Sequence, residues 1–253
     1  MTKHRSGITA LTGFLVIVLI VAAAFYITIP MVGTTPTTTS SGTTSVTTSS
    51  ASNPTGSSSG TLSMNVKQPL IVAPGVNMTA TLKFAAIGTV SGSYALSASS
   101  LPKGVTMTFK PSSLNLPGDL QNAVTLTISA ASGATLGNST VSVQATAGSS
   151  VFTQQFSLQS VQALVLIQGN AFTPNSLTIA AGTRVYWLNL DASGGGDVNA
   201  VAHDVTALDG SFSSGTSNLQ QYSTYSFTFA KAGTFKYDSS AQTSMTGQIV
   251  VTG

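Results

Sequence analysis

Alternation of apolar and polar residues is the dominant pattern in the middle of the chain. Four segments place apolar side chains on one face and mostly Thr or Ser on the other: 62–66, 78–84, 105–109 and 124–128. A two-residue period is that of a half-buried β-strand. Three further segments, 94–98, 141–145 and 152–158, continue the pattern, and turn signals such as Ala73-Pro74-Gly75 separate the segments.

About seven short strands in roughly 100 residues are typical of an immunoglobulin-like (Ig-like) β-sandwich, which we predict for 61–160. The stretch Leu101-Pro-Lys-Gly-Val-Thr106 resembles the Ig-like modules of prokaryotic surface proteins. The resemblance implies a role in spacing or adhesion, without chemistry of its own.

A second β-pattern occupies 161–253. Its expected strands are 164–167, 177–179, 185–190, 203–207, 225–229, 234–237 and 248–251. The chain is therefore predicted to be all-β, with two successive sandwiches.

The N-terminal region 1–33 has a different character. An uncharged apolar run from Ile8 to Val32 follows Lys3 and Arg5, and the next basic residue is Lys67. Because about 20 apolar residues span a bilayer and basic residues stay inside, we predict a single-pass anchor with a cytoplasmic N-terminus. Two alternatives remain open. Ala22-Ala23-Ala24 is a candidate signal-peptidase site, and Arg5-Ser6-Gly7 resembles archaeal type IV pilin-like leaders cut after Gly7.

The segment 34–60 consists mostly of Thr and Ser and has no periodic apolar face. This composition predicts an extended stalk, glycosylated or bare, that holds the following domains away from the membrane. Asn77-Met-Thr79 and Asn138-Ser-Thr140 are candidate N-glycosylation sites on the exposed side.

The composition excludes several classes of function. Charged residues make up only 6% of the chain and no Lys/Arg cluster exists, which argues against nucleic-acid binding. The chain contains no Cys, so disulfides, thiol catalysis and thiolate-bound metals are excluded.

The C-terminal pattern resembles a specific family. The stretch Phe172-Thr-Pro-Asn-Ser-Leu-Thr-Ile-Ala-Ala-Gly-Thr-Arg-Val-Tyr-Trp-Leu-Asn189 is similar to the opening strands of plastocyanin-type cupredoxins, the blue-copper proteins. Ser226–Tyr237 and Met245–Val251 are similar to the strands that enter and leave the copper loop of that family. The resemblance implies a Greek-key sandwich for 161–253.

The family binds copper through two His, one Cys and a weak axial Met. On the register of the resemblance, His203 and Met245 match two ligands, whereas Ser239 stands at the cysteine position and Gln242 at the second histidine. A hydroxyl cannot replace a thiolate, so we expect no type-1 copper and no cofactor, and we do not expect His203 and Met245 alone to hold copper.

Structural roles, without chemistry, are expected for His203, Met245 and the residues around them. We expect His203 to hydrogen-bond to Ser239 or Gln242, and Met245 to fill an apolar pocket. Trp187 is expected in the core and Asn189 at a turn or edge. The segment 191–202 is longer than the family's connection, and two interpretations stay open: a new contact surface, or extra length without a role.

Neither a nucleophile–base set nor a carboxylate pair is evident, so we expect no enzymatic activity. The favoured function is a membrane-anchored cell-surface protein that acts in binding or structure, with a protein partner at the surface. Two alternatives remain open. One is a docking or accessory subunit of a respiratory electron-transfer complex, since cupredoxin domains of quinol-type oxidases resemble this case. The other is a pilin-like filament subunit.

Overall fold

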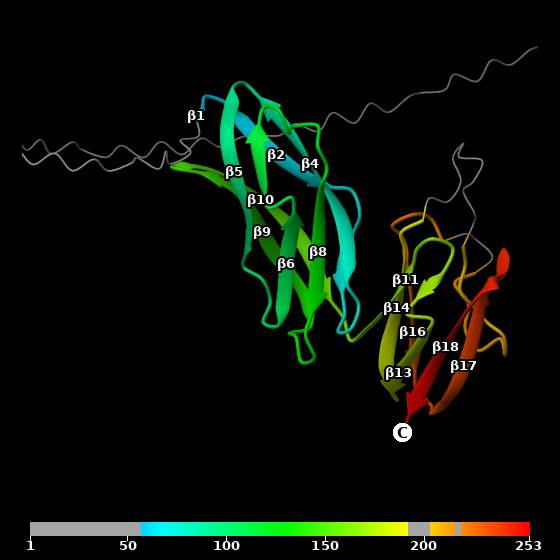
Figure 1. The fold of residues 1–253 in the computed structure, drawn as a ribbon. Coiled ribbons are helices and arrows are strands. Elements are labelled where there is room, and N and C mark those ends of the chain that lie inside the picture. Colours follow the sequence, from blue (N-terminus) through cyan, green and yellow to red (C-terminus); the bar gives the residue numbers. More distant parts are fainter. Residues whose placement is uncertain (1–56, 192–202, 216–218) are drawn as a thin grey trace, which may run out of the picture. The chain divides into compact units, whose positions relative to one another are not determined.

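The computed structural model describes residues 57–191, 203–215 and 219–253 (Figure 1). Every regular element in these ranges is a β-strand, which confirms the all-β prediction for this part of the chain. Among the described residues, none forms a helix long and apolar enough to cross a membrane. The predicted anchor 1–33 and most of the predicted stalk 34–60 lie outside the described ranges.

The N-terminal sandwich comprises two sheets. The first has the strand order β1-β5-β9-β10-β3, and β7 also pairs with β5. The second has the strand order β2-β4-β8-β6. Its strands are β1 (Ser57–Ser58), β2 (Thr61–Val66), β3 (Leu70–Val72), β4 (Met78–Ile87), β5 (Val90–Ser99), β6 (Val105–Lys110), β7 (Ser113–Leu116), β8 (Val124–Ala130), β9 (Gly137–Ala147) and β10 (Ser150–Ser160).

Alternation along the strands produces the core between these two sheets. In β4, Met78, Leu82 and the other even-numbered apolar residues through Phe84 are buried, whereas Thr79 and Thr81 are exposed. Since successive side chains of a strand point to opposite faces, one face of each sheet packs inward and the other meets solvent. Tyr94 of β5 and Leu126 of β8 are fully buried in the same core.

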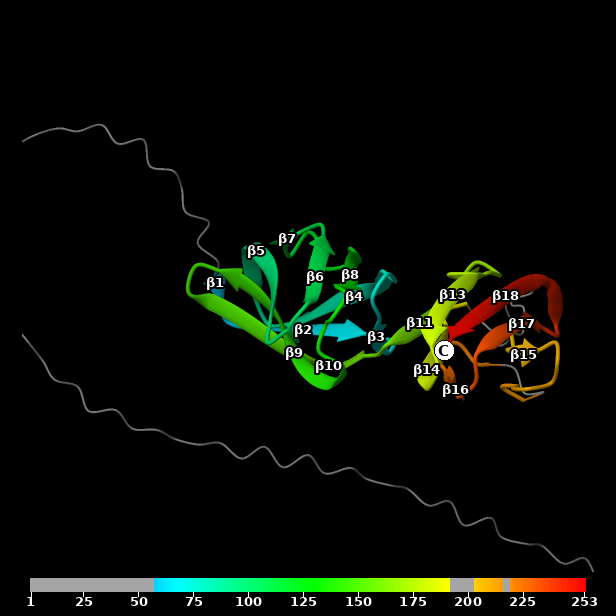
Figure 2. The same cartoon turned by 90° about the horizontal axis from the view of Figure 1, so that it is seen from below.

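The C-terminal sandwich also has two sheets, ordered β12-β11-β14-β16 and β13-β18-β17-β15 (Figure 2). Its strands are β11 (Ala163–Ile167), β12 (Phe172–Thr173), β13 (Ser176–Ala180), β14 (Thr183–Asn189), β15 (Thr206–Ala207), β16 (Thr224–Phe229), β17 (Gly233–Ser239) and β18 (Gln242–Thr252). All strand pairings among the described residues stay within 57–160 or within 163–252.

An aromatic cluster around Trp187 forms the centre of the C-terminal core. Trp187 is fully buried, as predicted, with ring centroids 5.5–6.3 Å from its aromatic neighbours Phe212, Tyr225, Phe229 and Tyr237. Burial raises the pKa of the Tyr237 phenol to about 12, so this ring is neutral at physiological pH.

The predicted strand 203–207 is mostly wrong, because only Thr206–Ala207 form a strand. The preceding residues use their backbone groups differently. Leu219 donates its N–H to the carbonyl of His203, and Asp204 donates its own N–H to the Ser239 hydroxyl. The short strands β1, β3, β7 and β12 were not predicted, since two to four residues are too few to display a period.

Candidate functional site

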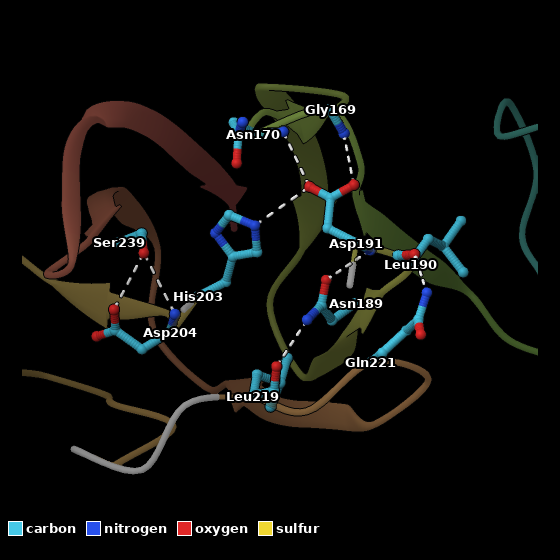
Figure 3. Close-up of polar contacts among 10 residues, drawn as sticks. All are labelled: Gly169, Asn170, Asn189, Leu190, Asp191, His203, Asp204, Leu219, Gln221 and Ser239. Carbon is cyan, nitrogen blue, oxygen red and sulfur yellow. Dashed lines mark hydrogen bonds and ion pairs between the residues drawn. The ribbon is translucent and has the colours of Figure 1, made fainter. Parts of the chain in front are cut away.

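Four residues stand at the positions of the copper ligands in the cupredoxin resemblance. Ser239 and Gln242 flank the β17–β18 turn, Met245 lies in β18, and His203 comes shortly before β15. His203 is fully buried, Met245 is buried in the C-terminal core, and Ser239 is fully buried at the end of β17. Ser239 pairs with Gln242 across the two-residue turn that joins β17 to β18. Two carboxylates, Asp191 and Asp204, organise the polar groups around them (Figure 3).

The first carboxylate, Asp191, binds the imidazole. Nε2 of His203 lies 3.1 Å from Oδ2 of Asp191, whose side chain is 19% exposed. Nδ1 of His203 is buried without a hydrogen-bond partner, and Figure 3 shows it turned away from Asp191. Since a carboxylate accepts, Nε2 carries the proton in this contact, and Nδ1 is the ring nitrogen on which the lone pair of the neutral form lies.

The same carboxylate fixes a tight turn between β11 and β12. Gly169 donates its N–H to Oδ1 of Asp191 at 2.7 Å, and Asn170 donates its N–H to Oδ2 at 2.9 Å. Both residues have positive φ, 63° and 57°, as a two-residue turn of type I′ requires, and Gly and Asn adopt this conformation most readily. The carboxylate therefore satisfies two backbone donors as well as the imidazole.

Asn189 connects Asp191 to the segment that begins at Leu219. Its Oδ1 accepts the N–H of Asp191 at 2.9 Å, and its Nδ2 donates to the carbonyl of Leu219 at 2.6 Å. Leu219 in turn donates its N–H to the carbonyl of His203. Asn189 is fully buried on β14, an inner strand of its sheet, so the expectation of a turn or edge residue was wrong.

The second carboxylate, Asp204, occupies the other side of the site. Oδ1 accepts from the Ser239 hydroxyl at 3.1 Å and from the Ser240 N–H at 2.6 Å. Oδ2 accepts from the Thr206 hydroxyl at 2.7 Å and the Ser240 hydroxyl at 2.9 Å. Burial alone would raise the pKa of Asp204, but the hydrogen bonds from Thr206, Ser240 and Ser239 together lower it below its usual value.

The donor set does not fit a type-1 copper centre. The chain has no thiolate, and the hydroxyl at the cysteine position is a donor to Asp204. Nδ1 of His203 and the Met245 thioether are the matched ligand types that remain, and the buried Oε1 of Gln242 adds only an amide oxygen. Across the described ranges, His, Asp, Cys and Glu nowhere gather in threes that could hold a metal ion.

The hydrogen bonds differ from those expected at the sequence level. We expected His203 to bond to Ser239 or Gln242, but its partner is Asp191, and Ser239 bonds to Asp204 instead.

The sequence predicts no role for either aspartate. The Gly169-Asn170 dipeptide is a recognisable hairpin signal, whereas Asp191 has no signal beyond its position two residues after Asn189. Of the extended loop 191–202, only Asp191 is described.

The two candidate glycosylation residues lie on the N-terminal sandwich. Asn77 is exposed just before β4, and the Ser129 hydroxyl donates to its Oδ1 at 2.8 Å. Asn138 is exposed near the start of β9. Whether either carries a glycan stays a prediction.

Comparison with known proteins gives a distant likeness. No protein-family model matches the chain, and no curated protein is detectably similar to it. The oxidized state of a proline-to-alanine mutant of amicyanin is 26% identical, with a TM-score of 0.30, over 36% of this chain and 81% of that chain. A purple cupredoxin from Nitrosopumilus maritimus is 23% identical, with a TM-score of 0.30, over 36% of this chain and 100% of that chain. Scores this low do not establish family membership.

Proposed function

We propose that this protein is a membrane-anchored cell-surface protein whose C-terminal domain is a copper-free, cupredoxin-like module acting in binding or structure. The anchor 1–33 holds the chain in the cell membrane with its N-terminus in the cytoplasm. The stalk 34–60 and an Ig-like N-terminal sandwich act as spacers that display the C-terminal domain outside the cell.

One observation carries the copper-free part of the proposal. Ser239, at the position of the family's cysteine, is fully buried and donates its hydroxyl to Asp204. That carboxylate also accepts from Thr206 and from both donors of Ser240. A network in which each group has its partner supports a structural role, because it rigidifies the β17–β18 turn in the way a metal does in a metalloprotein.

The topology is tested by adding protease to intact cells. We expect cleavage within 34–56 and release of both sandwiches into the medium, because the Thr- and Ser-rich composition of this segment predicts no packed structure, whereas Ser57–Ser58 already form β1 of the sandwich. A C-terminal sandwich that is protected in intact cells but cleaved after lysis would invert the topology.

The role is tested by purifying the full-length protein from membranes in mild detergent. We expect it to lack stoichiometric copper and any oxidase subunits. Co-purification of a terminal oxidase would replace this proposal with the accessory-subunit alternative. Recovery as a long homopolymer from sheared surface fractions would favour the filament alternative.

A further inference from the structure

The open edge of β10 is the feature of the N-terminal sandwich that lacks an explanation. β10 pairs with β9 along its whole length, but on its other side it pairs only with β3, through Leu158, Gln159 and Ser160. Among the described residues, no backbone hydrogen bond reaches Val151–Ser157 from any element other than β9. Figure 2 shows β9 and β10 as a long hairpin at the rim of the sandwich.

The turn of this hairpin determines which backbone groups face the open side. Gly148 and Ser149 form a two-residue turn, so Ala147 and Ser150 are its closing pair and exchange hydrogen bonds. The alternation then directs the N–H and C=O groups of residues 151, 153, 155 and 157 away from β9. One side-chain contact agrees with this assignment of the outward-facing groups. Nε2 of Gln154 lies 3.4 Å from the carbonyl oxygen of Gln155, which is a carbonyl that makes no bond to β9.

The usual protections of an edge strand are missing here. Soluble proteins block open edges with Lys, Pro, bulges or very short strands. Residues 151–157, Val-Phe-Thr-Gln-Gln-Phe-Ser, contain no charge and no Pro, and Val151 is 52% exposed. By contrast, edge strand β6 ends in Lys110 followed by Pro111, and edge strands β12 and β15 have two residues each.

The sequence of this edge is complementary to itself. Phe152-Thr-Gln-Gln-Phe156 is nearly symmetric about Gln154. In an antiparallel pair of two β10 edges centred on Gln154, each Phe152 lies opposite Phe156 of the second copy, and each Thr153 lies opposite Gln155. The outward-facing backbone groups of residues 153 and 155 are then the ones that meet, as an antiparallel ladder requires.

Burial of the aromatic pair would favour this arrangement. Phe152 and Phe156 are only partly buried, on the face that packs against the core, and the ring of Phe152 lies 5.6 Å from that of Tyr94. Aromatic cross-strand pairs stabilise antiparallel sheets. We infer that this protein forms a two-fold homodimer through antiparallel pairing of the Val151–Ser157 edges of two copies. Such an interface closes on itself and does not propagate.

The inference does not depend on the proposed function, because it rests on a different domain. Its test begins with the mass of the full-length protein in detergent, measured by sedimentation with the detergent contribution subtracted. We expect a dimer. The Thr153→Lys/Gln155→Lys variant places Lys opposite Lys, so its dimer dissociation constant should rise at least about tenfold. Thr106→Lys/Thr108→Lys, at exposed positions of β6, is the matched control and should remain dimeric.

Charge exchange tests the register. Thr153→Asp/Gln155→Asp alone should weaken the dimer in the same way, and mixing it with the Thr153→Lys/Gln155→Lys variant should restore a tight dimer that contains one chain of each. Because the chain has no Cys, Gln154→Cys introduces a unique thiol. It lies opposite itself at a non-hydrogen-bonded position, where Cα atoms are close, and should form an intermolecular disulfide. Thr108→Cys should not.

Three results would overturn the inference. The first is a monomeric wild type at all concentrations tested. The second is a dimer that survives the Lys substitutions on β10, since the interface would then lie elsewhere. The third is a Gln154→Cys chain that crosslinks in membranes only to a different protein, which would assign the edge to a heterologous strand. Circular dichroism of each variant verifies that the sandwich remains folded.

Discussion

The imidazole of His203 and the carboxylate of Asp191 meet at 3.1 Å, although the two residues are 12 positions apart in the sequence. The same carboxylate holds the N–H groups of Gly169 and Asn170. Asp191 thus connects the β11–β12 turn, the end of β14 and the buried histidine. Loss of this carboxylate would therefore affect all three segments at once.

Removing this carboxylate should destabilise the C-terminal sandwich. Asp191→Ala leaves two backbone donors and a buried imidazole without their acceptor, which we expect to cost about 2–4 kcal/mol of unfolding free energy. Urea unfolding followed by tryptophan fluorescence measures this directly, because Trp187 is the single Trp and lies in this core. Asp209→Ala, which removes an exposed carboxylate that accepts only locally, from Ser211, should change little. Equal effects of the two variants would refute the assignment.

The low pKa of Asp204 predicts a specific pH dependence. Because the folded-state pKa is depressed, the carboxylate contributes stability above its unfolded pKa of about 3.9, and this contribution is lost as the pH falls through the lower folded value. Asp204→Asn should therefore cost about 2–3 kcal/mol at pH 7. The difference from wild type should shrink below about pH 4, where the wild-type carboxyl becomes neutral as well.

Urea titrations of the Asp204→Asn variant at several pH values check this prediction. Asp209→Asn is the comparison: hydrogen bonds with Ser211 also lower the pKa of this carboxylate, but it is exposed to solvent, so its pH-dependent difference should be clearly smaller than that of Asp204→Asn. A cost for Asp204→Asn that is constant from neutral to strongly acidic pH would mean that the side chain acts through shape and not through its charge.

Introducing two copper-ligand side chains should create a copper centre. Ser239→Cys with Gln242→His supplies a thiolate and a second imidazole across the β17–β18 turn, and Met245 and Nδ1 of His203 are the other two ligands on the cupredoxin register. Asp191 already orients His203 through Nε2, as carboxylates do for metal-bound histidines. We expect the double variant to bind Cu(II) with an intense visible absorption, Ser239→Cys alone to do so poorly, and the wild type to show none. A folded, colourless double variant would show that the turn departs from cupredoxin geometry.

Gly247 should be intolerant of a side chain. A Cβ atom there would meet the ring of Tyr237 and lie 2.5 Å from its Oη, and this ring is fully buried against Trp187. Gly247→Ala should cost about 2–3 kcal/mol through overpacking and alter the Trp187 fluorescence. Gly118→Ala, where the nearest atom lies 3.5 Å away, should be tolerated. A Gly247→Ala protein as stable as wild type would mean that Tyr237 can move aside.

Much of the fold was predictable because its signal is local. The alternation in 78–84 and 124–128 fixes which side chains of β4 and β8 face inward, since successive residues of a strand point to opposite sides. Burial of Trp187 was predicted from the residue type, because a large aromatic side chain in a sandwich most often lies in the core. The absence of Cys, which a count of residues reveals, is enough to exclude a thiolate ligand.

What the sequence could not determine is how polar groups pair across distant segments. Several groups of the site have more than one chemically suitable partner in the sequence. The imidazole of His203 contacts Asp191 and not Ser239 or Gln242. The Ser239 hydroxyl bonds to Asp204, from whose N–H it accepts and to whose carboxylate it donates. The open edge of β10 depends likewise on strand order, which alternation leaves undetermined. Only the tertiary structure decides these pairings, because a hydrogen bond requires donor and acceptor within about 3.5 Å, and packing of both sheets sets that distance.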